Sequence, residues 1–544
     1  MRNILVTSAL PYANGSIHLG HLLEEIQTDI WVRLQKFLGH NCVYICADDT
    51  HGTAIMLSAK KNHESPEELI KRTQIEHMND FKGFYIDFDN YYTTHSEENK
   101  ALAEQIFLAA KEKGLIYQQE IEQFYCETCR IFLPDRLIKG TCPKCKTPEQ
   151  YGDNCENCSA TYNPQDLIDP YCVECKNKPI LKKSTHYFFS ISKSSDELKK
   201  WLAQNPVRQE IKNKLNEWFT EGLKDWDISR DAPYFGFNIP GEPDKYFYVW
   251  LDAPIGYIAS TMNWCHGDQT LFNKIWLNDD KNNPDPFEIF HFIGKDILYF
   301  HTLFWPCMLK AAEFKLPKKI FVHGFLTVNG QKMSKSRGTF ITASTYLKLL
   351  DPELLRYYYA SKLTSSIDDI DLNLEDFVFK VNSELINKFI NIASRLGKLI
   401  EKNFDLQLSV FEPEGEALLT EAKAAIPGII KLYEDLEYNK ALKEIMLITE
   451  TANKYINDQA PWEVAKTNKE LAQAICTTGI NFLKLITGLL KPVLPAVTAK
   501  IETFLIIDPI NYSTLTKPIL NQKINQYSHL LERVELAKVK ELVE

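Results

Sequence analysis

Two histidines three positions apart, His18 and His21, follow an apolar run at the N-terminus. At the start of a helix this spacing places both imidazoles on one face. Helix N-termini present unpaired N–H groups and the positive end of the helix dipole, so the pair could hold a phosphate chain. Gly20 between them would let a flat base approach the backbone. Taken alone, however, such a pattern is more often two solvent-facing histidines near a helix cap.

Two lysines, Lys332 and Lys335, form a second candidate site in the run Lys-Met-Ser-Lys-Ser. Gly330 and Gly338 flank this run, which is typical of a loop that can change shape. Two ammonium groups in such a loop could close over a triphosphate and neutralise the charge of a departing group. A solvated basic surface loop is the alternative interpretation.

Eight of the 13 cysteines form four Cys-x-x-Cys pairs between residues 126 and 175. Such a turn directs two thiolates at one ion, and two turns complete a closed, structural zinc site. No secretion signal precedes them, which favours a reducing compartment and metal binding over disulfides. We expect one or two zinc ions. The predicted inner cluster is Cys142, Cys145, Cys155 and Cys158, and the less certain outer cluster is Cys126, Cys129, Cys172 and Cys175.

These residues lie among elements of an α/β fold. A strand over 4–7, a helix from about 18 to 37 and a strand over 43–47 form a βαβ unit, so a parallel sheet is expected, with ligands at the carboxyl ends of its strands. The cysteine-rich segment interrupts the pattern, which resumes with strands expected over 246–250, 287–293 and 320–323. Beyond residue 383 the apolar spacing predicts helices throughout. The fold class predicted is α/β, a split Rossmann-like nucleotide-binding domain with a zinc-knuckle insertion, plus a C-terminal α-helical bundle.

The composition limits the class of protein. The chain has 544 residues, 44% of them hydrophobic, and a formal charge of −10, which indicates several folded domains and argues against a general basic coat for nucleic acid. No uncharged apolar run approaches 18 residues, so no membrane span and a cytoplasmic protein are expected. The apolar stretch over 472–501 contains three lysines and is expected to form the core of the bundle.

Together, the histidine and lysine motifs resemble those of the class I aminoacyl-tRNA synthetases in their order, their separation of about 300 residues and their βαβ context. The lysine run matches the family motif letter for letter, and the histidine motif departs from it only at Leu19. Further runs over 11–15, 46–49, 250–257 and 292–296 resemble the bacterial methionyl-tRNA synthetase family along nearly the whole chain. The domains expected are a catalytic first half (1–115), a zinc-knuckle insert (116–232), a catalytic second half (233–320), a lysine-loop region (321–382) and an anticodon-binding helical domain (383–544).

The resemblance implies a two-step reaction. Methionine and ATP would give methionyl-adenylate and pyrophosphate, and the methionyl group would then pass to the terminal adenosine of tRNA(Met), the initiator included. His18, Gly20, His21 and Lys335 would bind ATP, which carries Mg²⁺, and Lys332 and Lys335 would stabilise the departing pyrophosphate. Asp48 would pair with the substrate ammonium, although it could equally be a helix cap. The remaining methionine-binding residues implied are Leu10, Tyr12, Trp250, Ala253, Pro254, Tyr257, Ile297 and His301, which without the resemblance would be ordinary core.

The resemblance also implies an anticodon site at Asn391, Arg395 and Trp462, where an aromatic ring could stack on a splayed base. Trp462 could instead pack near a helix start. Residues 318–398 carry 12 basic and 8 acidic side chains, a local excess of four positive charges that modestly favours an RNA-facing side.

The insert, at roughly 115 residues, leaves little room for a large hydrolytic editing domain beside the metal knuckles. A monomer is expected, because no dimerising β-barrel pattern follows the helices. Three alternatives stay open: a cysteinyl-type synthetase, a nucleotidyltransferase with the same histidine motif, and a zinc-ribbon RNA-binding protein without catalysis.

Overall fold

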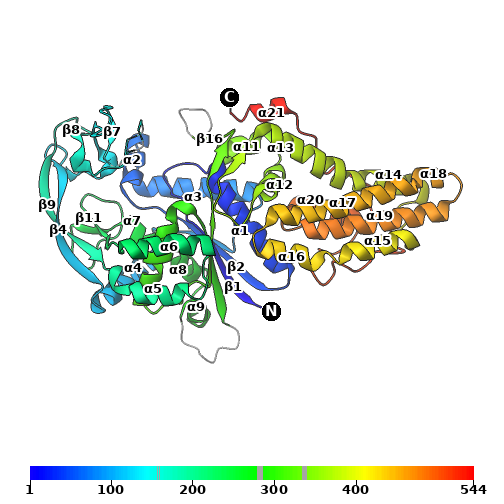
Figure 1. Ribbon diagram of the computed structural model, residues 1–544, viewed down its shortest axis with the longest axis horizontal. Coiled ribbons are helices and arrows are strands. Elements are labelled where there is room, and N and C mark those ends of the chain that lie inside the picture. The colour runs from blue at the N-terminus through cyan, green and yellow to red at the C-terminus, as the bar shows by residue number, and fades with distance from the viewer. Residues whose placement is uncertain (153, 156, 159, 278–285, 334–339, 544) are drawn as a thin grey trace.

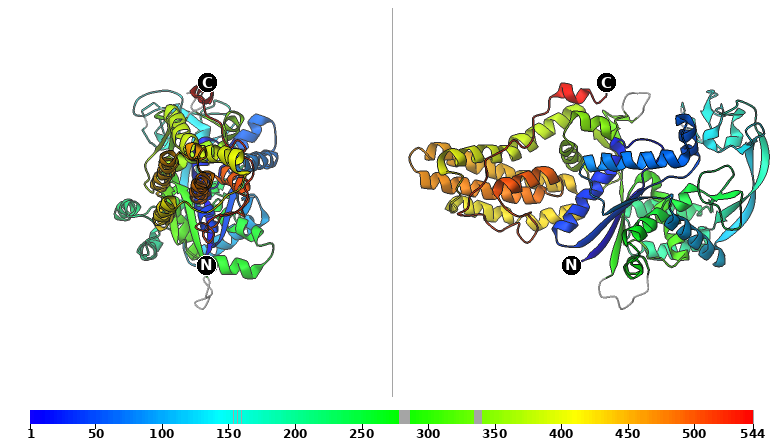
Figure 2. Two further views of the ribbon diagram at one scale, coloured as in Figure 1. Left: turned by 90° about the vertical axis from the view of Figure 1, so that its right-hand side faces the viewer. Right: turned by 180° about the vertical axis from the view of Figure 1, so that it is seen from behind.

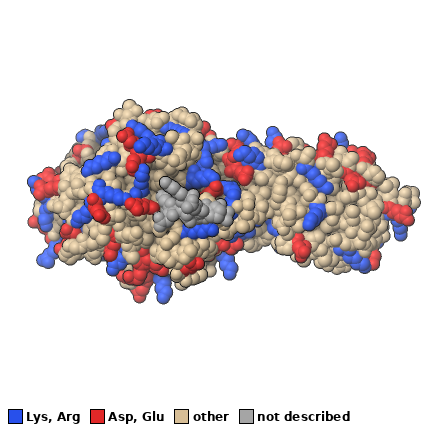
Figure 3. All heavy atoms as spheres, turned by 90° about the horizontal axis from the view of Figure 1, so that it is seen from below, with Lys and Arg blue, Asp and Glu red and all other residues tan. Residues whose placement is uncertain are grey.

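The computed structural model describes the chain except residues 153, 156, 159, 278–285, 334–339 and 544. The predicted Lys335 therefore lies outside the described residues. The molecule is elongated, with an α/β part at one end and a helical lobe at the other (Figure 1). On the face seen in Figure 3, basic and acidic side chains are interspersed over the α/β part.

A five-stranded parallel sheet forms the centre of the α/β part, with the strand order β14-β13-β1-β2-β3. Three strands come from the first hundred residues and two from beyond residue 286, which confirms the split nucleotide fold. β1 is central, and the order reverses between β1 and β13, where ligands bind in such sheets. The strands are β1 (Asn3–Ser8), β2 (Asn41–Asp48), β3 (Asn90–Thr93), β13 (Phe287–Gly294) and β14 (Lys319–His323).

Helices cover this sheet. α1 follows β1, buries most of its residues and ends at Phe37, with Leu38 as its C-cap. Gly39, at φ +84°, takes the left-handed conformation that stops the helix, as its sequence predicts. α1 also packs against α12 and α16, so it lies between the sheet and the helical lobe (Figure 2). The helices of this part are α1 (Leu19–Phe37), α2 (Thr53–Asn62), α3 (Pro66–Gly83), α4 (Glu97–Glu112), α7 (Val249–Asp252), α8 (Ile255–Trp264), α9 (Gln269–Trp276) and α10 (Trp305–Ala311), the last preceded by a π-helical turn (Phe300–Phe304).

The prediction of a strand over 246–250 is wrong in its second half. β12 (Lys245–Phe247) pairs with β11 (Ser229–Asp231), but α7 begins at Val249. The N–H groups of Leu251 and Ala253 bond to carbonyls three and four residues back, at 2.8 and 2.9 Å. A short apolar run can follow either a strand or a buried helix, and its periodicity alone does not distinguish them.

The insert is built on a long antiparallel hairpin of β4 (Ile116–Cys126) and β9 (Ile180–Phe189). A small three-stranded sheet near its tip carries most of the cysteine turns (Figure 1). The remaining strands and α-helices are β5 (Ile131–Phe132), β6 (Ile138–Thr141), β7 (Gln150–Tyr151), β8 (Ile168–Cys172), β10 (Trp226–Asp227), α5 (Ser195–Leu202) and α6 (Gln209–Glu221).

A second small sheet and the helical lobe follow β14. The sheet consists of β15 (Leu326–Val328), β16 (Gln331–Lys332) and β17 (Ile370–Leu372). The domain boundary expected at residue 383 falls within a continuous helical run over 374–404. The helices are α11 (Ala343–Leu349), α12 (Pro352–Lys362), α13 (Leu374–Lys380), α14 (Asn391–Phe404), α15 (Pro413–Lys423), α16 (Ile426–Glu434), α17 (Tyr438–Gln459), α18 (Pro461–Val464), α19 (Lys469–Leu490), α20 (Pro495–Leu505) and α21 (Leu536–Lys540), with a π-helical segment (Val381–Ile390) before α14.

The expectation of helices throughout this region is wrong between α20 and α21. The chain there forms no helix and bonds instead to the lobe, for example through Asn481 to the backbone of Ile519. Pro509 and Pro518 interrupt any helical ladder in this segment. Among the described helices, α19 alone is long and apolar enough to cross a membrane, and 89% of its most apolar window is buried inside the protein, as expected for a core helix.

One buried arginine joins the α/β part to the helical lobe. Arg356 of α12 is fully buried and donates to Asp29 of α1 at 2.6 Å. The same guanidinium donates to the carbonyls of Phe84, Pro492 and Val493, at 3.2, 3.1 and 2.8 Å. The helix that carries His21 is therefore fixed against the lobe that contains α19 and α20.

Candidate active site

His18 and His21 cap the N-terminus of α1, at the carboxyl end of β1. The backbone N–H of Gly20 donates to His18 Nδ1 at 3.0 Å, and that of His18 donates to His21 Nδ1 at 3.3 Å. The two rings stack with centroids 3.7 Å apart. Burial and the neighbouring His18 lower the pKa of His21 well below its usual range. Because each Nδ1 accepts a hydrogen bond, each neutral ring carries its proton on Nε2, where it can donate to an anion.

The segment around the lysine motif meets these histidines across the chain. The N–H of Leu19 donates to the carbonyl of Ile341 at 3.0 Å, and that of Ala343 donates to Ile17 at 2.9 Å. A β-carbon on Gly20 would lie 2.7 Å from Met333 Cε. Lys332 is exposed on β16, one residue before Met333. The described residues on both sides of Lys335 thus converge on the start of α1.

A buried pair, Glu24 and His323, lies beneath the contact between the two motifs. Glu24 of α1 lies 3.0 Å from His323 Nε2, at the end of β14, and also accepts the N–H of Ala9. His323 Nδ1 lies 2.7 Å from the carbonyl of Gly324 and donates to it, since a carbonyl only accepts. Burial opposes charge on His323, but these two acceptors outweigh it and raise the pKa of the imidazole. The pair ties the strand that leads into the lysine loop to the helix that carries the histidines.

The residues expected to bind methionine lie on segments that contact one another. Tyr257 of α8 donates its hydroxyl to His301 Nε2 at 3.0 Å, and His301 Nδ1 donates to the carbonyl of Ile297 at 3.2 Å. Burial lowers the pKa of His301 to about 4, so this ring is neutral at pH 7. A β-carbon on Gly256 would lie 2.8 Å from Leu10 Cδ2, which places Leu10 against the same helix.

Trp250 lies on α7, and Ala253 and Pro254 link this helix to α8. The Trp250 side chain is 41% exposed, unlike the buried Tyr257. Its ring stacks on Tyr248 with centroids 5.9 Å apart. Trp250 therefore lies at the exposed edge of an aromatic cluster that includes Trp226 and Phe300.

Asp48 has partners other than the expected one. Its Oδ1 lies 2.6 Å from His77 Nδ1 and 2.5 Å from the Tyr91 hydroxyl. His77 Nε2 donates to the carbonyl of Gly15 at 2.8 Å, so the imidazole uses both nitrogens as donors and is positively charged. Burial opposes this charge, but the bond to Asp48 outweighs it and raises the pKa of His77. One oxygen of Asp48, Oδ1, is therefore paired within the protein, whereas its Oδ2 has no hydrogen-bond partner among the described residues.

The neighbouring Asp49 has no such counter-charge. It is partly exposed, and its Oδ1 is buried without a hydrogen-bond partner among the described residues. Its backbone pairs with Tyr12, one of the residues expected to bind methionine. Burial and the nearby Asp252 raise the pKa of the Asp49 carboxyl well above its usual range. A cation placed beside this carboxyl group would favour its ionised form.

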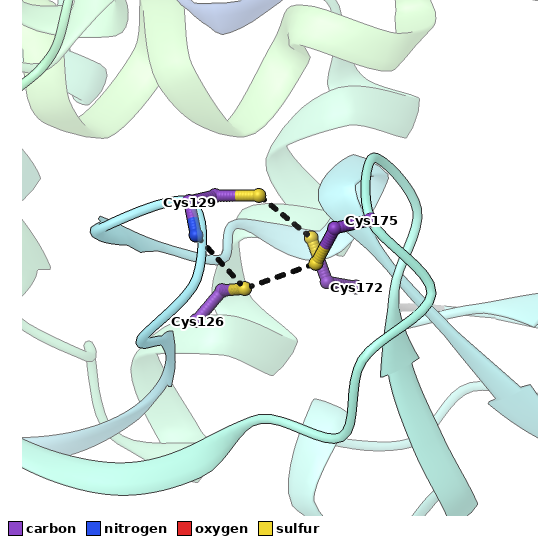
Figure 4. Close-up of side chains that lie close together, drawn as sticks. All are labelled: Cys126, Cys129, Cys172 and Cys175. Atoms are coloured by element: carbon purple, nitrogen blue, oxygen red, sulfur yellow. Dashed lines mark hydrogen bonds between the residues drawn. The ribbon is translucent and has the colours of Figure 1, made fainter.

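The eight cysteines form the two clusters expected from their spacing. Within each cluster one sulfur from each of the four residues lies within 4.8 Å of the others. Neighbouring sulfurs are 3.4 and 3.9 Å apart in both clusters (Figure 4 shows the outer one). Tetrahedral zinc with Zn–S bonds of about 2.3 Å requires sulfurs about 3.8 Å apart. The donor sets therefore fit closed tetrahedral metal sites.

The sequence of the chain matches those of known protein families. Residues 4–397 match the family described as class I tRNA synthetases (M), and residues 409–541 match the anticodon-binding domain of methionyl-tRNA ligase. The chain belongs to the methionine–tRNA ligase family. A methionine–tRNA ligase from Thiobacillus denitrificans (strain ATCC 25259 / T1) is 53% identical over 546 residues, covering all of this chain and 78% of that protein.

Solved structures of methionyl-tRNA synthetase share the fold. The Mycobacterium tuberculosis enzyme in complex with methionyl-adenylate superposes with a TM-score of 0.79 at 24% identity, covering 97% of this chain and 99% of that one. Its apo form gives 0.73 at 22% identity, covering 98% and 99%. At such identities the likeness shows the fold alone.

The family's expected anticodon residues lie together on the helical lobe. Arg395 of α14 places its guanidinium carbon 4.8 Å from the ring centre of Trp462 and donates to Asn457 at 2.8 Å. Asn391 lies one turn before Arg395 on the same helix. Trp462 is 37% exposed on α18, at the far end of the lobe from the insert (Figure 1).

Several residues of this methionine–tRNA ligase site escape prediction from the sequence. His51, His77 and His323 have no motif of their own, and each is paired with a carboxylate distant in sequence. The adjacent aspartates Asp48 and Asp49, at the end of a predicted strand, do indicate an acidic site. Nothing in the sequence indicates which of the two carboxylates is already paired.

Proposed function

We propose that this chain activates L-methionine with ATP and then transfers the methionyl group to the 3′-terminal adenosine of tRNA(Met), the initiator included. The observation that carries the proposal is the convergence of His18 and Gly20 with Met333 and the residues that follow the lysine loop. This convergence occurs at the carboxyl end of β1, in a chain of the methionine–tRNA ligase family.

In the first step a methionine carboxylate oxygen bonds to the α-phosphorus of ATP while the bond to the pyrophosphate oxygen breaks. The nucleophile is already ionised, so positioning and charge stabilisation supply most of the catalysis. The Nε2–H groups of His18 and His21 donate to the phosphates, and Gly20 leaves room for the nucleotide. Lys332 and Lys335 balance the charge of the leaving pyrophosphate. Mg²⁺ bound with ATP would add positive charge to the phosphates.

We propose Asp49, rather than Asp48, as the group that receives the substrate ammonium. Asp48 already bonds to the charged His77, whereas Asp49 has no counter-ion among the described residues. Asp49 also pairs through its backbone with Tyr12. The methionine side chain would lie against the aliphatic and aromatic residues expected from the sequence, which are Leu10, Tyr12, Trp250, Ala253, Pro254, Tyr257, Ile297 and His301.

Each cysteine cluster would hold one structural Zn²⁺, because four thiolates leave no open position on the ion. The outer cluster is attached to the catalytic part. Glu174, between Cys172 and Cys175, bonds to Lys60 of α2, and Leu57 of the same helix packs on the apolar residues around the cluster. The inner cluster lies farther out on the insert and includes the exposed Cys158.

The anticodon of tRNA(Met) would bind at Trp462, Arg395 and Asn391. The indole ring can stack on a base, while the guanidinium and amide groups can bond to base edges. Location in the cytoplasm and a monomeric state stay predictions.

Aminoacylation with radiolabelled methionine tests the proposal. We expect charging of both initiator and elongator tRNA(Met) that requires ATP and methionine together. A purified, folded chain that charges neither tRNA would contradict the proposal.

A further inference from the structure

One peptide group at the start of α1, between Leu19 and Gly20, is held at both of its ends. Its carbonyl, on Leu19, accepts the Tyr359 hydroxyl at 3.0 Å. Its N–H, on Gly20, donates to His18 Nδ1 at 3.0 Å. Because a peptide group is planar, these two bonds fix its orientation together. A tyrosine 340 positions from Leu19 is thus linked through one peptide group to the ring of His18.

Tyr359 lies on the face of α12 that packs against α1. Arg356 is three residues earlier on α12, so the two side chains share this face. Arg356 bonds to Asp29, and Tyr359 bonds to Leu19 nearer the start of the same helix. Tyr359 is fully buried, and burial raises the pKa of its hydroxyl well above the usual range. The hydroxyl therefore keeps its proton and stays a donor.

The first turn of a helix gains most from such a contact. Its N–H groups have no partner within the helix, and helix ends fray. In α1 the N–H groups of Gly20 and His21 donate to the His18 side chain. The N–H of Leu19 donates to the Ile341 carbonyl at 3.0 Å. The Tyr359 hydroxyl adds a contact from outside α1 on the carbonyl side of the same turn.

The position of the His18 proton depends on this arrangement. In a neutral imidazole, the hydrogen bond made by one ring nitrogen decides which nitrogen carries the proton. An N–H that donates to Nδ1 leaves the proton on Nε2. A carbonyl that accepts a hydrogen bond also makes the N–H of its own peptide group a stronger donor. If this peptide group turned, Nδ1 could take the proton, and Nε2 would present a lone pair to a phosphate oxygen.

The neighbouring tyrosines of α12 make different contacts. Tyr357 is equally buried, but its hydroxyl donates to Glu384 at 2.8 Å. The Tyr358 hydroxyl donates to Asp376 at 2.9 Å. Of these three hydroxyl groups, and within the part of the chain that the structure describes, only that of Tyr359 bonds to α1. Tyr357 therefore provides a control that matches Tyr359 in helix, burial and the atom removed.

We propose that Tyr359 is a positioning residue for phosphate binding. Its hydroxyl orients the peptide group between Leu19 and Gly20, which keeps the His18 proton on Nε2, where it donates to ATP. The proposal rests on the phosphate-binding role proposed above for His18. Tyr359 acts on ATP only through that ring.

A double-mutant cycle tests this route. Tyr359→Phe removes only the hydroxyl, and Tyr357→Phe removes the same atom from the control residue. His18→Gln supplies an amide donor in place of Nε2 but lacks Nδ1, so it leaves Tyr359 nothing to orient. Pyrophosphate exchange gives kcat and the KM values for ATP and methionine, for each single variant and for the double variant of His18 and Tyr359.

We expect Tyr359→Phe to lower kcat/KM for ATP about fivefold, the scale of one hydrogen bond, with the methionine KM unchanged. Tyr357→Phe should stay within about twofold of wild type, and Tyr359→Phe should add no further loss to His18→Gln, because residues that act through one another are not additive. Equal kinetics of Tyr359→Phe and Tyr357→Phe, or losses that multiply in the double variant, would overturn the proposal.

His18→Gln separates this inference from the proposed function. Normal ATP kinetics in His18→Gln would reject the role of His18 and the inference with it. An impaired His18→Gln beside a normal Tyr359→Phe would reject the inference alone.

Nitrogen-15 spectra of histidine-labelled protein give a second measurement, which begins with wild type and so does not require Tyr359→Phe to fold. They are recorded at pH 8, where an ordinary imidazole is neutral, and the His18 signals are assigned by their loss in His18→Gln. Wild type should carry the His18 proton on Nε2, and Tyr359→Phe should add the tautomer with the proton on Nδ1. A proton on Nδ1 in wild type, or identical His18 signals in wild type and Tyr359→Phe, would overturn the proposal.

Discussion

Met333 Cε lies where a side chain on Gly20 would have to go, 2.7 Å from the position of its β-carbon. Residues more than 300 positions apart are therefore in contact at the start of α1. The hydrogen bond from Leu19 to Ile341 fixes the same pairing through the backbone. In the proposed reaction the nucleotide is held from both sides, and this contact brings the two sides together.

Gly20→Ala tests that contact. Its methyl group would displace Met333 or the His18 ring, and the ring is held by the N–H of residue 20. We expect kcat/KM for ATP in pyrophosphate exchange to fall about tenfold, which corresponds to about 1.4 kcal/mol. Gly15→Ala is the matched control, because no atom lies within 4 Å of its added carbon. Equal activity of the two variants would remove the proposed role of Gly20.

Lys335→Ala should lower adenylate formation by a factor of about 100 or more, about 2.7 kcal/mol, because a positive charge at the leaving pyrophosphate is lost. Methionine affinity should be almost unchanged, since the lysine acts on phosphate. Pyrophosphate exchange measures the first quantity and equilibrium methionine binding the second. The exposed Lys348 on α11, changed to Ala, controls for the loss of a surface charge. Near-wild-type exchange in Lys335→Ala would refute its role.

Trp462→Ala should leave pyrophosphate exchange intact and reduce charging of tRNA(Met) at least tenfold, because base stacking is worth about 1–3 kcal/mol. Parallel exchange and charging assays separate the two steps. Tyr512→Ala is a suitable control, because Tyr512 is also an exposed aromatic residue, at 45%. Equal charging by Trp462→Ala and wild type would exclude an anticodon contact there.

Metal analysis should find two zinc ions per chain. Cys158→Ser and Cys175→Ser should each lose one ion, from the inner and outer clusters respectively. Because Lys60 and Leu57 join the outer cluster to α2, Cys175→Ser should lower Tm more than Cys158→Ser does. Mass spectrometry and calorimetry measure the two effects. Protein purified without zinc, or equal Tm losses, would contradict this account.

The buried pair of His77 and Asp48 predicts a pH-dependent stability. Asp48 raises the pKa of His77 in the folded state, so the pair's contribution is complete below the unfolded pKa of about 6.5. It is lost as pH rises through the higher folded pKa. His77→Asn keeps a donor near Asp48 but cannot be charged. The Tm difference between wild type and this variant should therefore shrink from pH 6 to pH 9, and a difference that grows would refute the charged pair.

Local patterns in the sequence predict much of the framework. The apolar spacing of α1 and its stop at Gly39 are confirmed, as are four of the sheet strands and both cysteine clusters. These features depend on neighbours a few residues away or on repeated turns. The extended segment between α20 and α21 differs, because its hydrogen bonds come from α19 and other parts of the lobe.

The charge balance of the site could not be predicted in this way. Whether Asp48 or Asp49 is available depends on His77, 29 positions from Asp48, and on Asp252, more than 200 positions away. The sequence contains every one of these groups, but only the folded chain shows which carboxylate each histidine meets.

Pyrophosphate exchange with each of the twenty amino acids tests the central claim most directly. The account predicts rapid, ATP-dependent exchange with methionine and at most slow exchange with close isosteres, because one methylene in an apolar site is worth only about 1–3 kcal/mol. No exchange with methionine, or faster exchange with another amino acid, would show that the convergence at Gly20 does not form a methionine-activating site.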